Sequence, residues 1–329
     1  MFDLSLTDSE REEISSLVGD LSGRYLSAEV PELLERAPVF ARALPHRVQE
    51  HLNRLRRHEP GYTVIHGHHV DDAQVGPTPG HWNALPDPSP TLALDLTLVL
   101  YAGVLGDAFG WATQQDGRVI HDVLPIKENE GQQLGTAADV LLDWHTEDAF
   151  HPLRPDFLAL ACVRNPTATA TTVAVVDDLQ LTEADRRVLG EPRFRILPDN
   201  SHLPANNSVS ASGDFQGIEA MFAAPPAVAL LEGDYLRADR SFWGVIDPAD
   251  TEAQATLERL TGEIDLRLRS VVLEPGDILI VDNFRAVHGR VPFEARYDGT
   301  DRWLKRVLIT RDLRKSRAAR PSLLGQVVG

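Results

Sequence analysis

The chain has 329 residues, of which 43% are hydrophobic and 25% charged, so it can bury a large apolar core. Its formal net charge of −17 argues against nucleic acid or an anionic membrane as a partner, because either would need a broad basic face. No signal peptide or membrane-spanning stretch is visible, and the single cysteine, Cys162, cannot form an intramolecular disulfide. The expected location is the cytoplasm.

The N-terminal third is predicted to consist of packing helices. Thr7 and Glu10 have the spacing of a capping box at the start of the first helix. Pro31 suits the first turn of a second helix, which Pro38 should end or bend, and a third helix should stop near Pro60-Gly61. No chemistry is visible in these helices.

The next part of the chain holds the densest group of histidines. His66 and His68 could share one face of a strand as metal ligands do, but no partner ligand can be identified by spacing, so hydrogen-bonded or solvated histidines are the better interpretation. Residues 92–105 are expected to form a buried helix. Asp116-Gly117 predicts a two-residue hairpin between strands over 111–115 and 118–124.

The rest of the chain alternates apolar strands with polar turns. Strands are expected at 157–163, 171–176, 194–197 and 227–231. Because helices are confined largely to the N-terminal third and one later insertion, we predict a mainly β fold with flanking helices, built on a jelly-roll (double-stranded β-helix) core. We expect one domain over 1–329. It would comprise a helical part to about 107, a core to about 312 and a lid at 233–266 that ends in an amphipathic helix from 251.

The candidate chemistry begins at His145 and Glu147. On an extended strand alternate side chains share a face, so both can point the same way, although such a pair alone is more often polar surface. A third candidate ligand, His288, follows a buried apolar run. Two imidazoles and one carboxylate leave adjacent positions open, which suits non-haem iron(II) that binds a co-substrate and oxygen together. Fourteen residues later, Arg302 could hold a carboxylate bidentately.

At this point the chain resembles the iron(II)- and 2-oxoglutarate-dependent oxygenases, specifically the clavaminate synthase-like branch. Within it, the likeness is to the free-amino-acid hydroxylases of antibiotic biosynthesis, typified by the arginine 3-hydroxylase of the viomycin pathway. The resemblance covers most of the chain. It rests on YAGVLGD at 101–107, GWATQQDGR at 110–118, WHTED at 144–148 and KRVLITRD at 305–312.

The resemblance implies three iron(II) ligands, namely His145, Glu147 and His288. It also implies that Arg302 holds the distal carboxylate of the co-substrate 2-oxoglutarate with help from Thr172. From the residues alone, either Thr171 or Thr172 could donate that hydroxyl, or both could simply fill a strand. The implied reaction hydroxylates an unactivated carbon with O2 and releases succinate and carbon dioxide.

A free amino acid is the implied substrate, with L-arginine, hydroxylated at C3, as the leading hypothesis. Arg306 is two strand steps beyond Arg302 and could receive the α-carboxylate. Gln114 and Glu147 would contact the α-amino group. In the lid, Asp239 would face the guanidinium group.

Two departures from the arginine hydroxylase pattern keep other substrates open. Ser241 stands where a second lid aspartate is expected, and Leu134-Gly135-Thr136-Ala137 replaces a serine-rich segment. Lysine, a cyclised arginine derivative, asparagine or another neutral amino acid, and desaturation of arginine remain alternatives. A zinc hydrolase would leave Arg302 unexplained, and a barrel that only binds a small acid would not need all three ligands. The oligomeric state is left open.

Overall fold

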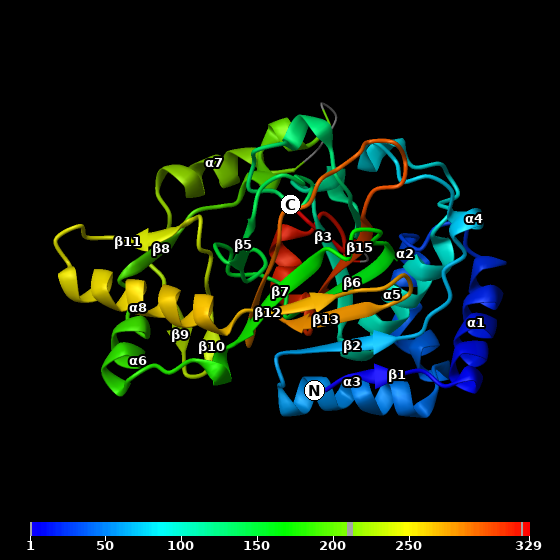
Figure 1. Cartoon of the computed structure of the whole chain (residues 1–329), viewed down its shortest axis with the longest axis horizontal. Coiled ribbons are helices and arrows are strands. Elements are labelled where there is room, and N and C mark those ends of the chain that lie inside the picture. Colours follow the sequence, from blue (N-terminus) through cyan, green and yellow to red (C-terminus); the bar gives the residue numbers. More distant parts are fainter. Residues whose placement is uncertain (1, 209–212, 324) are drawn as a thin grey trace.

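Two β-sheets packed face to face form the centre of the molecule (Figure 1), in a computed structural model that describes residues 2–208, 213–323 and 325–329. The larger sheet runs in the order β1 (Leu4–Ser5), β2 (Tyr62–His66), β13 (Ile278–Asp282), β6 (Phe157–Arg164), β15 (Trp303–Thr310), β3 (Asp107–Trp111) and β16 (Val327–Val328), and β4 (Ile120–Val123) also pairs with β15. The smaller sheet runs β12 (Arg269–Val272), β7 (Ala170–Val175), β14 (Ala286–Arg290) and β5 (Leu142–His145). This is the two-sheet arrangement that a jelly roll requires.

Alternating side chains decide what each sheet face packs against. On β15, Leu304 and Leu308 point between the sheets, where they share one apolar cluster with Val173 of β7. Residues of β15 that point to the opposite face, including Trp303 and Val307, belong to the apolar cluster beneath the N-terminal helices. Because β15 is buried on both faces, a side chain that points inward from it is held rigidly.

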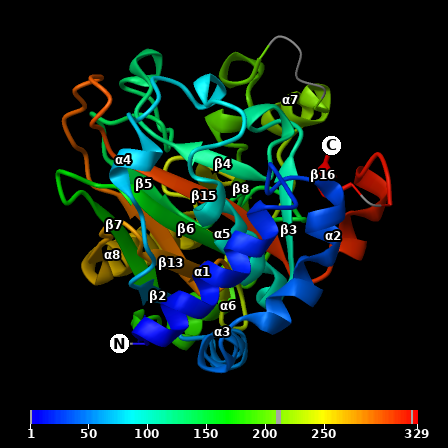
Figure 2. The ribbon, with the colours of Figure 1, turned by 90° about the vertical axis from the view of Figure 1, so that its right-hand side faces the viewer.

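The N-terminal helices cover the outer face of the larger sheet (Figure 2). They are α1 (Asp8–Ser22), α2 (Pro31–Phe40), α3 (His46–His58), the short α4 (Asp72–Val75) and α5 (Leu92–Leu105). The predicted capping box is present, since the Glu10 amide donates to Thr7 Oγ1 at 3.3 Å and the Thr7 amide to Glu10 Oε2 at 2.8 Å. Pro31 is in the first turn of α2, and Pro38 lies inside this helix, which ends two residues later.

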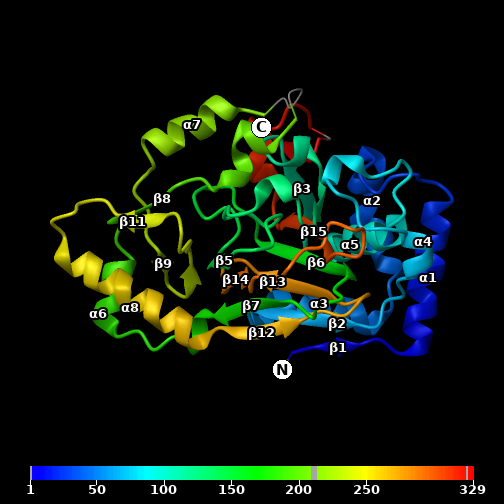
Figure 3. The same cartoon turned by 45° about the horizontal axis from the view of Figure 1, so that its top comes forward.

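The second half of the chain adds a group of elements beside the smaller sheet (Figure 3). It contains α6 (Glu183–Leu189), α7 (Phe215–Ala223) and α8 (Thr251–Arg267), with the strand pairs β8 (Phe194–Ile196) with β11 (Trp243–Val245) and β9 (Leu231–Glu232) with β10 (Tyr235–Leu236). The strand predicted at 227–231 is wrong over most of its length, since β9 covers only Leu231–Glu232 and Val228 forms only an isolated bridge with Phe194. The predicted helix at 251–266 is α8, which packs its apolar face on α6 and the smaller sheet.

The predicted hairpin at Asp116-Gly117 is wrong. β3 ends at Trp111, and a 3₁₀ turn over Gln115–Gly117 leads to β4. Both strands pair with β15, β4 along residues 304–307 and β3 along 308–310. The eight-residue β15 is long enough to pair with the two strands in succession, so the turn residues join consecutive partners of β15.

His66 and His68 of the histidine cluster make hydrogen bonds, as the sequence indicated. His66 Nδ1 lies 3.0 Å from Asp277 Oδ1, and His68 bridges the Gly276 carbonyl oxygen at 2.8 Å and the Tyr101 hydroxyl at 2.7 Å. Within the described ranges, no helix has the length and apolar character needed to cross a bilayer.

Candidate active site

The two histidines of the predicted triad are held by direct strand pairing. His145 ends β5 and His288 lies in β14, and the two are cross-strand partners whose side chains point to the same side of the smaller sheet. Glu147 follows two residues after His145, where the chain leaves β5. Its amide donates to Asn283 Oδ1 at 2.6 Å, while Asn283 Nδ2 donates to the Glu147 and Pro155 carbonyl oxygens, both at 2.9 Å. Sequence reasoning missed this buried anchor, which only a long-range contact reveals.

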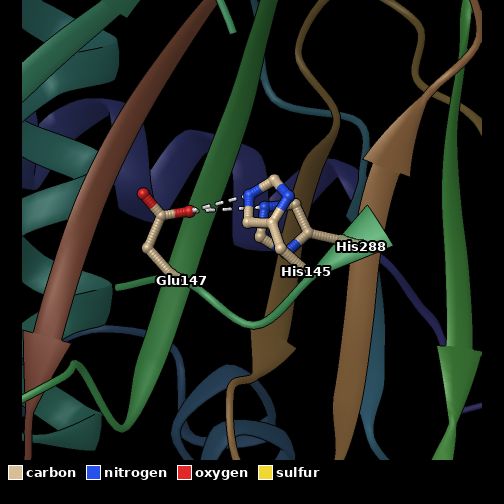
Figure 4. Close-up of side chains that lie close together, drawn as sticks. All are labelled: His145, Glu147 and His288. Carbon is tan, nitrogen blue, oxygen red and sulfur yellow. Dashed lines mark ion pairs between the residues drawn. The ribbon is translucent and has the colours of Figure 1, made fainter. Parts of the chain in front are cut away.

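Figure 4 shows both imidazole rings turned toward one carboxylate oxygen. Glu147 Oε2 lies 3.6 Å from His145 Nε2 and 3.4 Å from His288 Nε2. His145 Nδ1 donates to the Asp143 carbonyl oxygen at 2.9 Å, which leaves Nε2 free to bind a cation. Among the described residues, the buried Glu147 Oε2 has no hydrogen-bond partner. The donor set and this unsatisfied oxygen fit a divalent metal ion.

The pKa values of the two triad histidines are shifted in opposite directions. Burial disfavours a charge on His145, but the adjacent carboxylate of Glu147 raises the pKa of His145 to about 9. Burial and the charge of His145 lower the pKa of His288 to about 4. A metal ion bound by the triad would supply positive charge beside Glu147 in place of a proton on His145.

Arg302 stands at the start of β15 and points into the same pocket. Its Nη2 donates to Thr171 Oγ1 at 3.3 Å, and no carboxylate of the described chain lies within ion-pair distance of its guanidinium. Burial lowers the pKa of Arg302 to about 10. The hydroxyl beside Arg302 belongs to Thr171, whereas Thr172 pairs with Gly289 and faces the other side of the sheet. Strand alternation therefore places Thr171, and not the expected Thr172, beside Arg302.

Arg306 lies beside the triad. Its Nη1 pairs with Glu147 Oε1, and its Nη2 lies 2.7 Å from His121 Nδ1 and 3.4 Å from Gln114 Oε1. His121 Nε2 lies 3.0 Å from the Arg118 carbonyl oxygen, so the other ring nitrogen accepts from Arg306. The structure thus brings Gln114, Glu147 and Arg306 together as expected and adds His121, for which the sequence contained no signal.

The pocket wall also carries acidic side chains. Asp143, Asp199 and Asp239 all line it. Asp239 accepts from the amides of Ser241 and Phe242, both at 3.2 Å, while the Ser241 hydroxyl donates to Asp143 Oδ2 at 2.7 Å. Burial and the charge of Asp199 raise the pKa of Asp239 to about 7, against the opposing charge of His145.

The segment between β4 and β5 forms one wall of the pocket. Gln133, Leu134 and Gly135 line it together with Asp143. Arg290 of β14 ties this wall to the barrel. It donates to the Ala137 carbonyl oxygen and, at 2.8 Å, to that of Val140.

Comparisons with known proteins agree with this site. The family profile described as taurine catabolism dioxygenase TauD, TfdA family matches residues 95–308. An L-ornithine/L-arginine 3-hydroxylase of Catenulispora acidiphila is 44% identical over 98% of both chains, and an enduracididine beta-hydroxylase of Streptomyces hygroscopicus is 42% identical over 100% of both. A crystal structure of the non-haem iron oxygenase OrfP with Fe, succinate and (3S)-hydroxy-L-Arg matches with a TM-score of 0.94 and 44% identity, covering 99% of each chain.

These matches confirm the predicted jelly-roll fold and the predicted enzyme class, an oxygenase that uses iron and 2-oxoglutarate. By the extent of the family match and by the identity to its relatives, the chain belongs to the TauD/TfdA family of dioxygenases.

Proposed function

We propose that this enzyme hydroxylates C3 of free L-arginine, with His145, Glu147 and His288 as the iron(II) ligands. The observation that carries the proposal is the charge layout of one pocket. Besides the triad, the pocket is lined by the arginines Arg302 and Arg306 and by three carboxylates, Asp143, Asp199 and Asp239. A dicarboxylate co-substrate and an amino acid with a cationic side chain have the charges that match these two sets of residues.

The co-substrate end is formed by Arg302 and Thr171. A buried guanidinium without a carboxylate partner is costly, and the distal carboxylate of 2-oxoglutarate would supply two charge-assisted hydrogen bonds. Thr171 Oγ1 would orient that carboxylate. Thr171 lies on the paired strand β7 and Arg302 directly precedes β15, which keeps the contact rigid.

The backbone end of the amino acid fits the group around Arg306. Gln114 Nε2 donates to Ser201 Oγ at 2.6 Å, so its carbonyl oxygen is turned toward Arg306. That oxygen and Glu147 would accept from the α-ammonium group, while Arg306 would bind the α-carboxylate. Arg306 would then contact both the substrate and the metal ligand Glu147. This shared contact would place Cα and C3 of the substrate beside the metal.

The side-chain end fits the acidic group. Asp239 would bind the guanidinium, with Asp143 and Asp199 adding negative charge around it. Ser241 stands in place of a second lid aspartate, and its hydroxyl donates a hydrogen bond to Asp143. The acidic end therefore does not depend on a second lid carboxylate.

The protein's contribution to the reaction is positioning. Iron(II), 2-oxoglutarate and O2 supply the oxidising chemistry that replaces C–H by C–OH. Arg306 and Gln114 fix one end of the amino acid and Asp239 the other, so that C3 is presented to the metal in one orientation. Residues 130–141 and the segment that carries Asp239, both of which line the pocket, would limit the entry of water.

A cyclised arginine derivative is the second candidate, because the enduracididine beta-hydroxylase is 42% identical over the whole chain and Ser241 leaves more room than an aspartate. The test is to incubate the iron(II)-loaded enzyme with 2-oxoglutarate and a panel of arginine, enduracididine, lysine, ornithine and asparagine. The products are then identified by mass spectrometry and NMR. A 3-hydroxyarginine product supports the proposal, whereas no turnover of arginine, or its desaturation, overturns it.

Two further properties belong to this proposal. The whole chain acts as one domain, since the larger sheet takes β1 and β2 from the N-terminal part and β16 from the end of the chain.

The enzyme works in the cytoplasm, because its single cysteine, Cys162, is a buried free thiol, which suits a reducing compartment.

A further inference from the structure

Arg290 is a buried guanidinium that the proposed reaction leaves without a role. It is 3% exposed, lines the pocket and is the cross-strand partner of Thr171. Its three nitrogens donate to the backbone carbonyl oxygens of Ala137, Val140 (2.8 Å) and Val291 (3.2 Å). In the described part of the chain, no carboxylate lies within ion-pair distance of it. Carbonyl dipoles solvate such a cation but leave its net charge in place.

The same threonine brings Arg290 close to Arg302. Arg302 donates to the hydroxyl of Thr171, and Arg290 faces Thr171 on the neighbouring strand. Two buried guanidinium groups without a carboxylate partner therefore share one wall of the pocket, and their charges repel. A dianion bound at Arg302 would relieve this repulsion, so the charge of Arg290 favours 2-oxoglutarate over a monocarboxylate.

The other contacts of Arg290 lead to the rim, which we define as residues 130–141. This stretch contains no helix or strand. Its links to the barrel include the two Arg290 hydrogen bonds and the Phe293 amide, which donates to the Ala138 carbonyl oxygen. Gln133, Leu134 and Gly135 of the same stretch line the pocket beside Asp143. Arg290 thus connects the rim backbone with Thr171, the residue whose hydroxyl accepts from Arg302.

We infer that Arg290 is a positioning residue that couples 2-oxoglutarate binding to closure of the rim over the substrate pocket. The co-substrate's charge stabilises the guanidinium in its buried place, and the guanidinium in turn holds the carbonyl groups of Ala137 and Val140. The rim is then ordered before the amino acid binds. This inference rests on the proposed co-substrate site at Arg302.

The test combines binding and amide exchange in the iron(II)-loaded enzyme under nitrogen, without amino acid. Calorimetry gives the Kd of 2-oxoglutarate, and hydrogen–deuterium exchange of residues 130–141 is followed with and without it. In the wild type we expect 2-oxoglutarate to slow exchange of the rim at least about fivefold. Arg290→Gln should raise the Kd about tenfold and abolish that protection. Arg290→Lys keeps the charge but cannot reach two carbonyls, so it should retain the Kd within about threefold and still lose the protection.

Arg320 provides a matched control. It is also buried, at 7% exposure, and donates to the carbonyl oxygens of Leu313, Leu323 and Gly325, but it lies outside the pocket. Arg320→Gln should leave both the Kd and the rim protection unchanged. An equal effect of Arg320→Gln would show that loss of any buried guanidinium loosens the protein, and this result would overturn the inference.

Further outcomes distinguish failure of the role inferred for Arg290 from failure of the proposed co-substrate site at Arg302. The coupling is overturned if 2-oxoglutarate does not change the exchange rate of the rim in the wild type. It is also overturned if 2-oxoglutarate still protects the rim in both Arg290→Lys and Arg290→Gln. The first of these outcomes needs no variant, so it decides even if one variant folds poorly. Arg302→Gln is measured alongside. An unchanged Kd in Arg302→Gln removes the proposed co-substrate site itself, whereas a raised Kd there with an unaffected Arg290→Gln removes only the role of Arg290.

Discussion

The metal end and the acidic end of the pocket are built in different ways. His145, His288 and Arg302 stand on or beside paired strands, and cross-strand register fixes which residues meet. Of the acidic residues, Asp143 lies on β5, whereas Asp199 and Asp239 lie in connections outside the two large sheets, held by backbone amides and by an isolated bridge between Asp239 and His145. The chemistry that all substrates share is thus placed on or beside rigid strands, and two of the three carboxylates proposed to select the substrate lie on segments that can vary.

The largest effect is expected at the rigid end. His288→Ala removes one of three ligands, and because even residues that support metal ligands are worth about 10- to 100-fold, activity should fall by more than about 100-fold. Iron content, measured after loading and gel filtration, should drop with it, while the circular dichroism spectrum stays that of the wild type. Full iron occupancy in this variant would show that the triad is not the metal site.

The effect of removing Arg302 should be smaller and should be confined to the dependence of activity on the co-substrate. Arg302→Ala removes a charge-assisted contact of about 1.5–3 kcal/mol, so the 2-oxoglutarate concentration for half-maximal succinate formation should rise about 10- to 100-fold. The KM for arginine should change little. An unchanged 2-oxoglutarate dependence would make Arg302 a structural residue.

At the acidic end the effect should depend on the substrate. Asp239→Asn leaves the guanidinium of arginine underpaired in a closed pocket, so kcat/KM for arginine should fall about tenfold or more. Turnover of L-citrulline, the uncharged analogue of the same shape, should change less than about threefold. Equal losses with both substrates would mean that Asp239 shapes the lid without recognising charge.

The smallest effect is a pH dependence. Because burial and Asp199 raise the pKa of Asp239 to about 7, this carboxyl is largely protonated at pH 6 and ionised at pH 8. The KM for arginine should therefore fall as the pH rises from 6 to 8, by up to about tenfold. The KM for citrulline measured in the same buffers should stay flat, and a parallel slope for both substrates would assign the titration to another group.

The sequence predicted the strand-borne parts well and the rest less well. A histidine and a carboxylate two residues apart, and arginines four apart, are visible in the chain because strand periodicity is local. The choice between Thr171 and Thr172 needed the register of β7 against β14, which no local pattern contains. His121, Asn283 and Arg290 act through contacts 136 to 185 residues away, and the hairpin was mispredicted because β15 pairs with both flanking strands.

The central claim is that one pocket binds a dicarboxylate at its arginine end and a cationic amino acid at its carboxylate end. The most direct measurement compares kcat/KM of the unmodified enzyme for L-arginine and L-citrulline, at pH 8 and saturating 2-oxoglutarate. The charge layout predicts a preference for arginine of about tenfold or more. Equal values, or a preference for citrulline, would contradict it.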